Sequence, residues 1–128
     1  MTTPIGPATA AAHELARVAA QAADGKKGLD TLILDVGNVL AITEAFVVTS
    51  AGNRRQVRTI ADAVEEETKI LLERAPLRVE GLADLQWVLL DYGDVVVHVF
   101  ADETRRFYEI ERLYRDAPRM EWTPAPTD

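Results

Sequence analysis

Residues 86–100 read Gln-Trp-Val-Leu-Leu-Asp-Tyr-Gly-Asp-Val-Val-Val-His-Val-Phe. Two apolar runs rich in strand-forming residues flank the tetrapeptide Asp91-Tyr92-Gly93-Asp94, and Asp and Gly are common turn residues. The pattern predicts an antiparallel hairpin at the centre of a sheet. Its bend gathers a Trp, a Tyr and two carboxylates in a chain that is only 6% aromatic. These side chains either pack and cap the hairpin or form a surface that a partner recognises.

The segments on either side of the hairpin alternate between helical and strand patterns. Helices are expected over about 9–23, 54–74 and 103–115, and further strands over 29–36, 46–49 and 77–79. The order predicts a single α/β domain with three helices and a mixed sheet of about five strands. We place this domain at 9–117, between expected flexible tails at 1–8 and 118–128. The apolar spacing predicts which side chains the last two helices bury: Val57, Ile60, Ala61, Val64, Leu71 and Leu72, then Phe107, Ile110, Leu113 and Tyr114.

The composition narrows the class of protein. A length of 128 residues fits one domain, and the absence of Cys excludes disulfides and thiolate metal sites. The sequence has neither a membrane-spanning apolar run nor the pattern of a secretory signal, so a cytoplasmic location is expected.

The net charge of −7 is unevenly distributed. Residues 1–79 carry nine basic and ten acidic side chains, whereas residues 80–128 carry five basic and eleven acidic ones. An acidic half disfavours naked nucleic acid and suits a basic protein partner. Solubility alone is the other interpretation.

Three carboxylates suggest an enzymatic alternative. The stretch Asp35-Val-Gly-Asn-Val-Leu resembles the nucleophile strand of haloacid-dehalogenase-type phosphatases, with Asp91 and Asp94 as metal-binding acids. In such an enzyme the strand with Thr49 would supply the hydroxyl motif. However, the connection between the expected strands 29–36 and 46–49 has no room for the helix of a parallel crossover, so these two strands are expected to be antiparallel. A metal-dependent phosphatase or nucleotidyltransferase-like enzyme using Asp35, Asp91 and Asp94 is therefore kept as the alternative function.

Other reaction classes have weaker support, and no cofactor or metal is predicted. Ser50 is the sole Ser, and the two His are far apart in sequence. His13 is expected to be exposed, and His98 to be a hydrogen-bonded residue of the sheet. Residues 50–55 open the long helix, where backbone donors and two arginines fit either an anion site or an ordinary capped start.

Three segments carry a resemblance to a known family. Gln-Val-Arg-Thr-Ile-Ala-Asp-Ala-Val at 56–64, the hairpin at 87–100 and Arg-Phe-Tyr-Glu-Ile-Glu-Arg-Leu-Tyr at 106–114 closely resemble the ribosomal silencing factor family, RsfS, also called Iojap-like. The resemblance runs from about Glu14 to Ala117. It implies an α/β domain like the core of nucleotidyltransferases, without catalytic residues and without enzymatic activity. The absence of a Gly-Ser dipeptide and of Asp-x-Asp agrees with this.

The resemblance also implies a partner. Family members bind the large ribosomal subunit through large-subunit ribosomal protein fourteen (uL14), which sterically blocks joining of the small subunit and represses translation under nutrient limitation. A homodimer formed through the same hairpin face is a third interpretation.

The family's hairpin residues are then expected at or beside the contact with the ribosomal protein: Trp87, Asp91, Tyr92, Gly93, Asp94 and His98. Trp87 and Tyr92 would supply contact area, and Asp94 and Asp91 would pair with Lys or Arg of the partner. Gly93 would allow the turn, and His98 has a structural role as its alternative.

Overall fold

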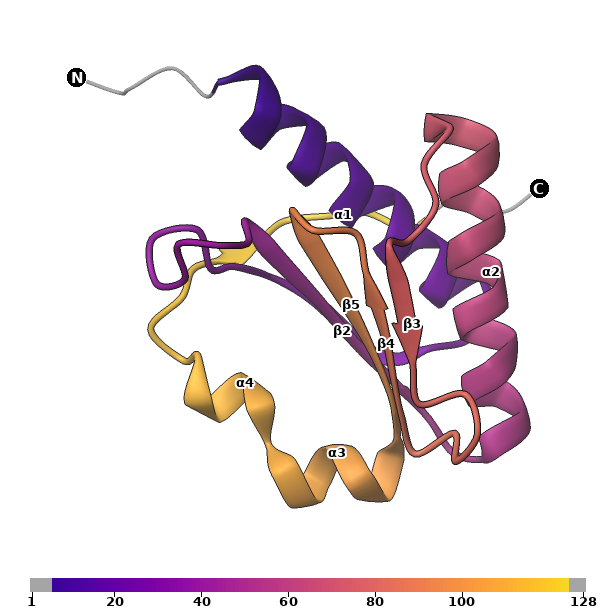
Figure 1. Ribbon diagram of the computed structural model, residues 1–128. Helices are drawn as coiled ribbons and strands as arrows, with labels where there is room; N and C mark the ends of the chain where they lie inside the picture. The colour runs from indigo at the N-terminus through magenta and orange to yellow at the C-terminus, as the bar shows by residue number, and fades with distance from the viewer. Residues whose placement is uncertain (1–5, 125–128) are drawn as a thin grey trace.

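The computed structural model describes residues 6–124, which form one sheet with helices on both faces (Figure 1). Along the chain the elements are α1 (Pro7–Gly25), β1 (Leu29–Asp35), β2 (Ala45–Ala51), α2 (Arg54–Leu72), β3 (Arg78–Glu80), β4 (Trp87–Asp91), β5 (Val95–Ala101), α3 (Asp102–Tyr108), α4 (Ile110–Leu113) and β6 (Arg119–Met120). The sheet has six strands in the order β3-β4-β5-β2-β1-β6. The expected single α/β domain with a mixed sheet is therefore confirmed, with one strand more than predicted.

The predicted hairpin lies inside the sheet. Strands β4 and β5 pair antiparallel from Trp87 opposite Phe100 to Asp91 opposite Val96. Strands β1 and β2 are also antiparallel, as the short connection between them required. Strand β2 pairs parallel with β5, and the long connection between these two strands includes α2.

Helices α1 and α2 close one side of the sheet, here called the helix face (Figure 1). Strand residues alternate between the two sides, so Val88 and Leu90 of β4 point to this face. Helix α1 buries mainly alanines, whose small side chains let the helix lie close to its neighbours. Helix α2 buries Thr68 but leaves Leu71 exposed, so the prediction of a buried Leu71 was wrong.

The opposite side, here called the groove face, is only partly covered. Its buried cluster contains Phe46, Val48 and Phe100, and α4 and the segment after it contribute Ile110 and Ala117. Helices α3 and α4 lie on this side of the sheet (Figure 1).

The predicted continuous helix over 103–115 is broken at Glu109. This residue has φ 47°, a left-handed conformation, and ends α3 before α4 begins. The break separates the apolar side chains that a continuous helix would have placed on one face. Phe107 and Leu113 are 79% and 76% exposed, so the prediction that both are buried was wrong, and Ile110 points inward as expected.

Both expected tails contain ordered residues. Helix α1 begins at Pro7. Proline suits the first position of a helix, since an N–H there would have no partner within the helix. Residues 119–120 form β6, which pairs antiparallel with β1, where irregular structure was expected. Residues 1–5 and 125–128 lie outside the described part of the chain.

A buried arginine that was not predicted from the sequence connects α3 to the sheet. Arg105 is 7% exposed, and its guanidinium donates to Leu29 O, Asp30 O and Ser50 Oγ. Its Nε donates to Glu111 at 2.6 Å. Because all three guanidinium nitrogens have acceptors, the cost of burying the charge is offset, and α3 is fixed against β1 and β2. Among residues 6–124, no helix is long and apolar enough to span a membrane.

Candidate functional site

The uncovered part of the groove face forms a groove of about 550 Å³ next to the hairpin. We call it the sheet groove and define it by its lining: Leu40, Ile42, Thr43, Phe46, Leu77, Arg78, Leu89, Asp91, Gly93, Val96 and His98. Apolar side chains dominate this lining. Ile42 is 88% exposed and Leu77 is 74% exposed, although both are large aliphatic residues. Two such residues beside one groove are typical of an interaction surface.

The two-residue period of the hairpin selects which of its side chains enter the groove. Leu89 and Asp91 of β4 and Val96 and His98 of β5 line it, while their neighbours in sequence point to the helix face. Gly93 has φ 88°, and a Cβ added there would meet Leu77 Cδ1 at 3.3 Å. A side chain at this position would be strained and would also press on Leu77, so glycine suits both the turn and the groove.

Asp91 fixes the bend and also presents charge at the groove. Its Oδ1 accepts from Gly93 N at 2.8 Å, and its Oδ2 accepts from Arg78 Nη2 at 2.9 Å. The hydrogen bond from Arg78, followed by that from Gly93 N, lowers the pKa of the Asp91 carboxyl. Asp91 is therefore ionised at neutral pH and forms an ion pair with Arg78 at the groove's margin.

Tyr92 points the other way, into the helix face. It is 2% exposed, and its hydroxyl lies 2.8 Å from Thr68 Oγ1 of α2. Burial raises the pKa of the Tyr92 phenol. In this structure Tyr92 has almost no surface to offer a partner, so its burial does not support the contact area that the hairpin resemblance implied.

Asp94 is also engaged inside the protein. Its carboxylate accepts two hydrogen bonds from Arg74, at 2.8 and 2.9 Å, just beyond the end of α2. The hydrogen bond to Asp94 raises the pKa of the Arg74 guanidinium. The backbone oxygen of Asp94 accepts from Glu44 N at 2.8 Å and from Thr43 Oγ1 at 3.0 Å. Asp94 thus joins α2, the hairpin and the loop that carries Ile42.

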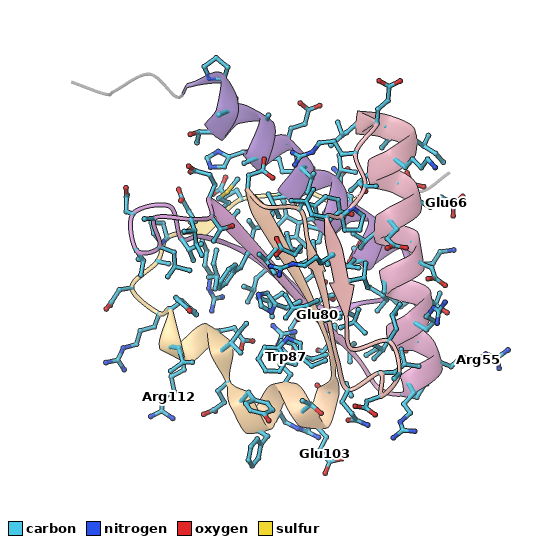
Figure 2. The ribbon with its side chains drawn as sticks, viewed as in Figure 1. Arg55, Glu66, Glu80, Trp87, Glu103 and Arg112 are labelled. Atoms are coloured by element: carbon cyan, nitrogen blue, oxygen red, sulfur yellow. The ribbon has the colours of Figure 1, made fainter. Side chains whose placement is uncertain are left out.

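Trp87 and His98 connect the groove to α3. Figure 2 shows Trp87 between the sheet and α3, and its ring lies 4.7 Å from that of Phe100 and 5.1 Å from that of Tyr108. Trp87 Nε1 donates to His98 Nδ1 at 3.1 Å, so the prediction of a hydrogen-bonded sheet histidine is confirmed. Burial lowers the pKa of the His98 imidazole to about 4. His98 is therefore neutral at pH 7, with its proton on Nε2.

The carboxylates of the enzymatic alternative do not converge. Asp35 Oδ1 accepts from Gly37 N at 3.3 Å at the end of β1, whereas Asp91 pairs with Arg78 and Asp94 with Arg74. Within residues 6–124, no group of three or more His, Cys, Asp or Glu side chains is placed to hold a metal ion. The geometry offers no observation in favour of metal-dependent phosphoryl chemistry at these three residues.

The other suspected residues have structural roles. Ser50 is fully buried and accepts a hydrogen bond from Arg105. Asn53 Oδ1 accepts from Gln56 N at 2.8 Å, which is the capped helix start expected for this segment. The Gln56 amide donates to Lys26 O and Lys27 O, so it does not complete a reciprocal capping box with Asn53. His13 is half-buried, not fully exposed as expected.

Sequence reasoning missed the two most exposed residues of the sheet groove. Ile42 lies in the loop between β1 and β2, and Leu77 follows Pro76 in the connection to β3. Neither belongs to an apolar pattern with a regular period, so neither was predicted to be buried or functional. Large aliphatic residues in loops around a hairpin are the signal that was available.

Comparisons with known proteins agree with the hairpin's resemblance. The family model described as "Ribosomal silencing factor during starvation" (RsfS) matches residues 9–128. The ribosomal silencing factor RsfS of Halalkalibacterium halodurans is 36% identical over 112 residues, which cover 85% of this chain and 92% of the relative. That of Bacillus subtilis is 35% identical over 105 residues, covering 80% and 86%.

A solved structure is similar in fold as well as in sequence. A crystal structure of a protein from Chromobacterium violaceum aligns with a TM-score of 0.77 at 32% identity. The alignment covers 80% of this chain and 85% of that one. The architecture described above is thus shared with a relative of known structure.

Proposed function

The chain belongs to the RsfS family of ribosomal silencing factors, and from that premise we propose that it docks on the large ribosomal subunit through ribosomal protein fourteen. In this proposal the bound domain sterically blocks joining of the small subunit and represses translation under nutrient limitation. It acts in the cytoplasm, where ribosomes work, and carries out no reaction of its own.

The observation that supports this proposal is the sheet groove. Several large aliphatic side chains of the described residues are exposed, and Ile42 and Leu77 are the two of these that lie beside a groove already lined by Leu89 and Val96. Burying such side chains against a partner contributes about 25 cal/mol for each Å² of apolar surface removed from water. The groove can therefore supply the apolar centre of a protein interface, with Arg78 and Asp91 at its polar margin.

The hairpin residues divide between contact and support in this proposal. Asp91, Gly93 and His98 line the groove, so they meet the partner. Tyr92 and Asp94 hold the bend from behind through Thr68 and Arg74. Trp87 donates a hydrogen bond to His98 and packs against Tyr108 of α3, so it positions the side chains at this end of the groove.

The proposed mechanism is occlusion. A folded chain of this length has a radius of gyration of about 14 Å. An object of this size fixed on a subunit-joining surface excludes the other subunit as long as it stays bound. The effect then depends on affinity and concentration and requires no turnover.

Cosedimentation with purified large subunits tests the docking surface. We expect the double variant Ile42→Asp with Leu77→Asp to bind about 100-fold more weakly, because each change places a charge in an apolar contact. Both side chains are exposed, so thermal unfolding should stay nearly unchanged. The matched control is Ile70→Asp with Leu71→Asp, which alters two exposed aliphatic residues of α2 outside the groove. Equal binding by the two double variants would refute the groove as the docking surface.

Light scattering during subunit joining tests the consequence of docking. The wild-type chain should lower the yield of joined ribosomes in proportion to the occupied large subunits, and the groove variant should not. Sedimentation of the isolated chain addresses the homodimer, which stays a prediction. If a dimer forms through the sheet groove, then Ile42→Asp with Leu77→Asp should dissociate it.

A further inference from the structure

Charge is segregated within the acidic second half of the chain. Residues 80–104 contain six acidic and no basic side chains, whereas residues 105–119 contain five arginines and three acidic side chains. The first stretch includes the hairpin, and the second contains most of α3, all of α4 and the first residue of β6. The acidic second half of the chain therefore contains a segment, 105–119, with a net charge of +2. A positively charged segment suits an anionic partner.

Four of the five arginines of this segment surround a hollow of about 450 Å³. Arg105, Arg106, Arg112 and Arg119 line it, and β1 forms its far side. We call this feature the arginine hollow. Four guanidinium groups drawn from α3, α4 and β6 thus surround one open space, although they are up to fourteen positions apart in the sequence.

One arginine is fixed and the others are available to a ligand. Arg105 is held by Glu111 and by backbone oxygens. The side chains of Arg106 and Arg112 are each 73% exposed, and among residues 6–124 their ion pairs are those with Asp102 at 3.6 Å and Glu109 at 3.4 Å. Figure 2 shows Arg112 extending from α4 away from the sheet. Such surface pairs contribute little, so their arginines can turn to a stronger anion.

Carboxylates also line the hollow, and two of them are held in ion pairs with its arginines. Glu111 is neutralised by the fixed Arg105, and Glu109 is the surface partner of Arg112. Asp30 is the third carboxylate of the lining, so four arginines face three acids. A phosphate that draws Arg106 and Arg112 outward would separate them from Asp102 and Glu109, at small cost.

The hollow lies on the same side of the sheet as the sheet groove. The groove is built on β3, β4, β5 and β2, whereas the hollow is built on β1 and β6 together with α3 and α4. Four strand steps separate β4 from β6, which is about 19 Å at the usual strand spacing. A large partner that fills the groove would bring its own neighbours to the hollow.

We propose that the arginine hollow binds the phosphate backbone of RNA that flanks the docked ribosomal protein. This inference rests on the proposed function, because docking on a ribosomal subunit is what places RNA beside the groove. Planar guanidinium groups bind phosphate through paired hydrogen bonds, and they need no particular base sequence. Phe107, exposed on α3 between Arg106 and Tyr108, adds an aromatic ring of the kind that stacks on unpaired bases. The groove beside the acidic hairpin would then bind the ribosomal protein, and the arginine hollow would bind RNA.

The salt dependence of binding to large subunits tests this proposal. In the triple variant Arg106→Gln, Arg112→Gln and Arg119→Gln, we expect the slope of log affinity against log salt to become shallower by about 2 to 3. Binding at low salt should weaken at least 10-fold. The control Arg54→Gln, Arg55→Gln and Arg58→Gln removes the same charge from the start of α2. A triple variant that keeps the wild-type slope and affinity would overturn the proposal. If the triple variant fails to fold, Arg112→Gln alone should still make the slope shallower by about 1.

A generic RNA probe separates this proposal from the proposed function. We expect a 20-base-pair RNA hairpin at low salt to bind the full wild-type chain and to lose most of its affinity for the triple variant. The groove variant Ile42→Asp with Leu77→Asp should bind the RNA hairpin as tightly as the wild type. Loss of probe binding in the triple variant supports the hollow even if the chain fails to sediment with large subunits. No binding of the probe, or equal loss in the α2 control, would contradict it.

Discussion

The two faces of the sheet are covered in different ways. On the helix face, α1 and α2 close over the strands, and the alanines of α1 leave the described residues there almost no exposed apolar side chain at the sheet. On the groove face, two short helices cover one part, and the rest is open, with Ile42 and Leu77 beside it. The helix face contributes the packed core, whereas the groove face leaves apolar side chains exposed to solvent.

The hairpin takes part in both faces, which explains why its residues looked ambiguous in the sequence. Tyr92 and Asp91 are adjacent, yet Tyr92 packs on α2 and Asp91 lines the sheet groove. Alternation along a strand sends neighbours to opposite sides. A single short motif can therefore carry both packing and recognition, and each residue must be assigned by its face.

The largest expected effect comes from the helix face. Tyr92→Ala removes a fully packed ring and leaves the Thr68 hydroxyl without its buried partner, so it should lower the free energy of unfolding by about 4 kcal/mol. Urea unfolding at pH 7 measures this. Tyr92→Phe keeps the ring and should cost only about 1 kcal/mol. A Tyr92→Ala variant that folds as stably as wild type but no longer binds large subunits would place Tyr92 in the interface and abolish the division between the faces.

Acid should weaken the groove face through His98. Its folded-state pKa of about 4 lies below the ordinary value near 6.5, because burial disfavours the charged imidazolium. The stabilisation by the neutral form is complete above pH 6.5 and is lost as the pH falls towards 4, by about 3 kcal/mol at pH 4. Protonation of Nδ1 would also break the hydrogen bond from Trp87.

Unfolding in urea at pH 7, 6, 5 and 4 measures this loss, and His98→Gln supplies the comparison. Carboxylates titrate in both proteins, so the difference between the two pH profiles isolates His98. Parallel profiles between pH 6.5 and 4 would mean that the imidazole is hydrated in the folded protein.

The fold could be predicted further than the site. Regular apolar spacing and a long strand–turn–strand pattern were enough for the helices, the hairpin and the antiparallel pair β1–β2. The break at Glu109 was not predictable in this way, because a non-glycine residue with positive φ has no sequence signal of its own. That single conformation exposes Phe107 and Leu113, which spacing alone had placed inside.

Asp91, Gly93 and His98 of the groove were expected from the hairpin, whereas Ile42 and Leu77 escaped prediction because they come from segments without a regular apolar period. Both lie in connections between regular elements, and only the folded sheet brings their loops to the same groove. Arg105 likewise looked like one of several surface arginines until folding placed carbonyls of β1 around it. Which charges pair internally depends on contacts between distant segments, and so Arg74 could not be assigned to Asp94 beforehand.

The smallest expected effect concerns the ion pair of Arg74 and Asp94, which lies at the bend of the hairpin between the helix face and the groove face. Asp94→Asn removes the charge that accepts two hydrogen bonds from Arg74 but keeps one acceptor and the size of the side chain. The pair is partly exposed, with 29% of the Asp94 side chain accessible, so we expect a loss of about 1 kcal/mol in the free energy of unfolding. Asp62→Asn, which alters the exposed pair with Arg58 on α2, should change nothing measurable.

The same variant separates two roles for Asp94. If its carboxylate serves Arg74, cosedimentation with large subunits should be unchanged, because this side chain does not line the sheet groove. If a partner's lysine or arginine takes the carboxylate from Arg74 on docking, Asp94→Asn should weaken binding at least 10-fold, in addition to the small loss of stability. The second result would move the docking surface across the bend towards α2, since Asp94 is the point where Arg74, the hairpin and the loop of Ile42 meet.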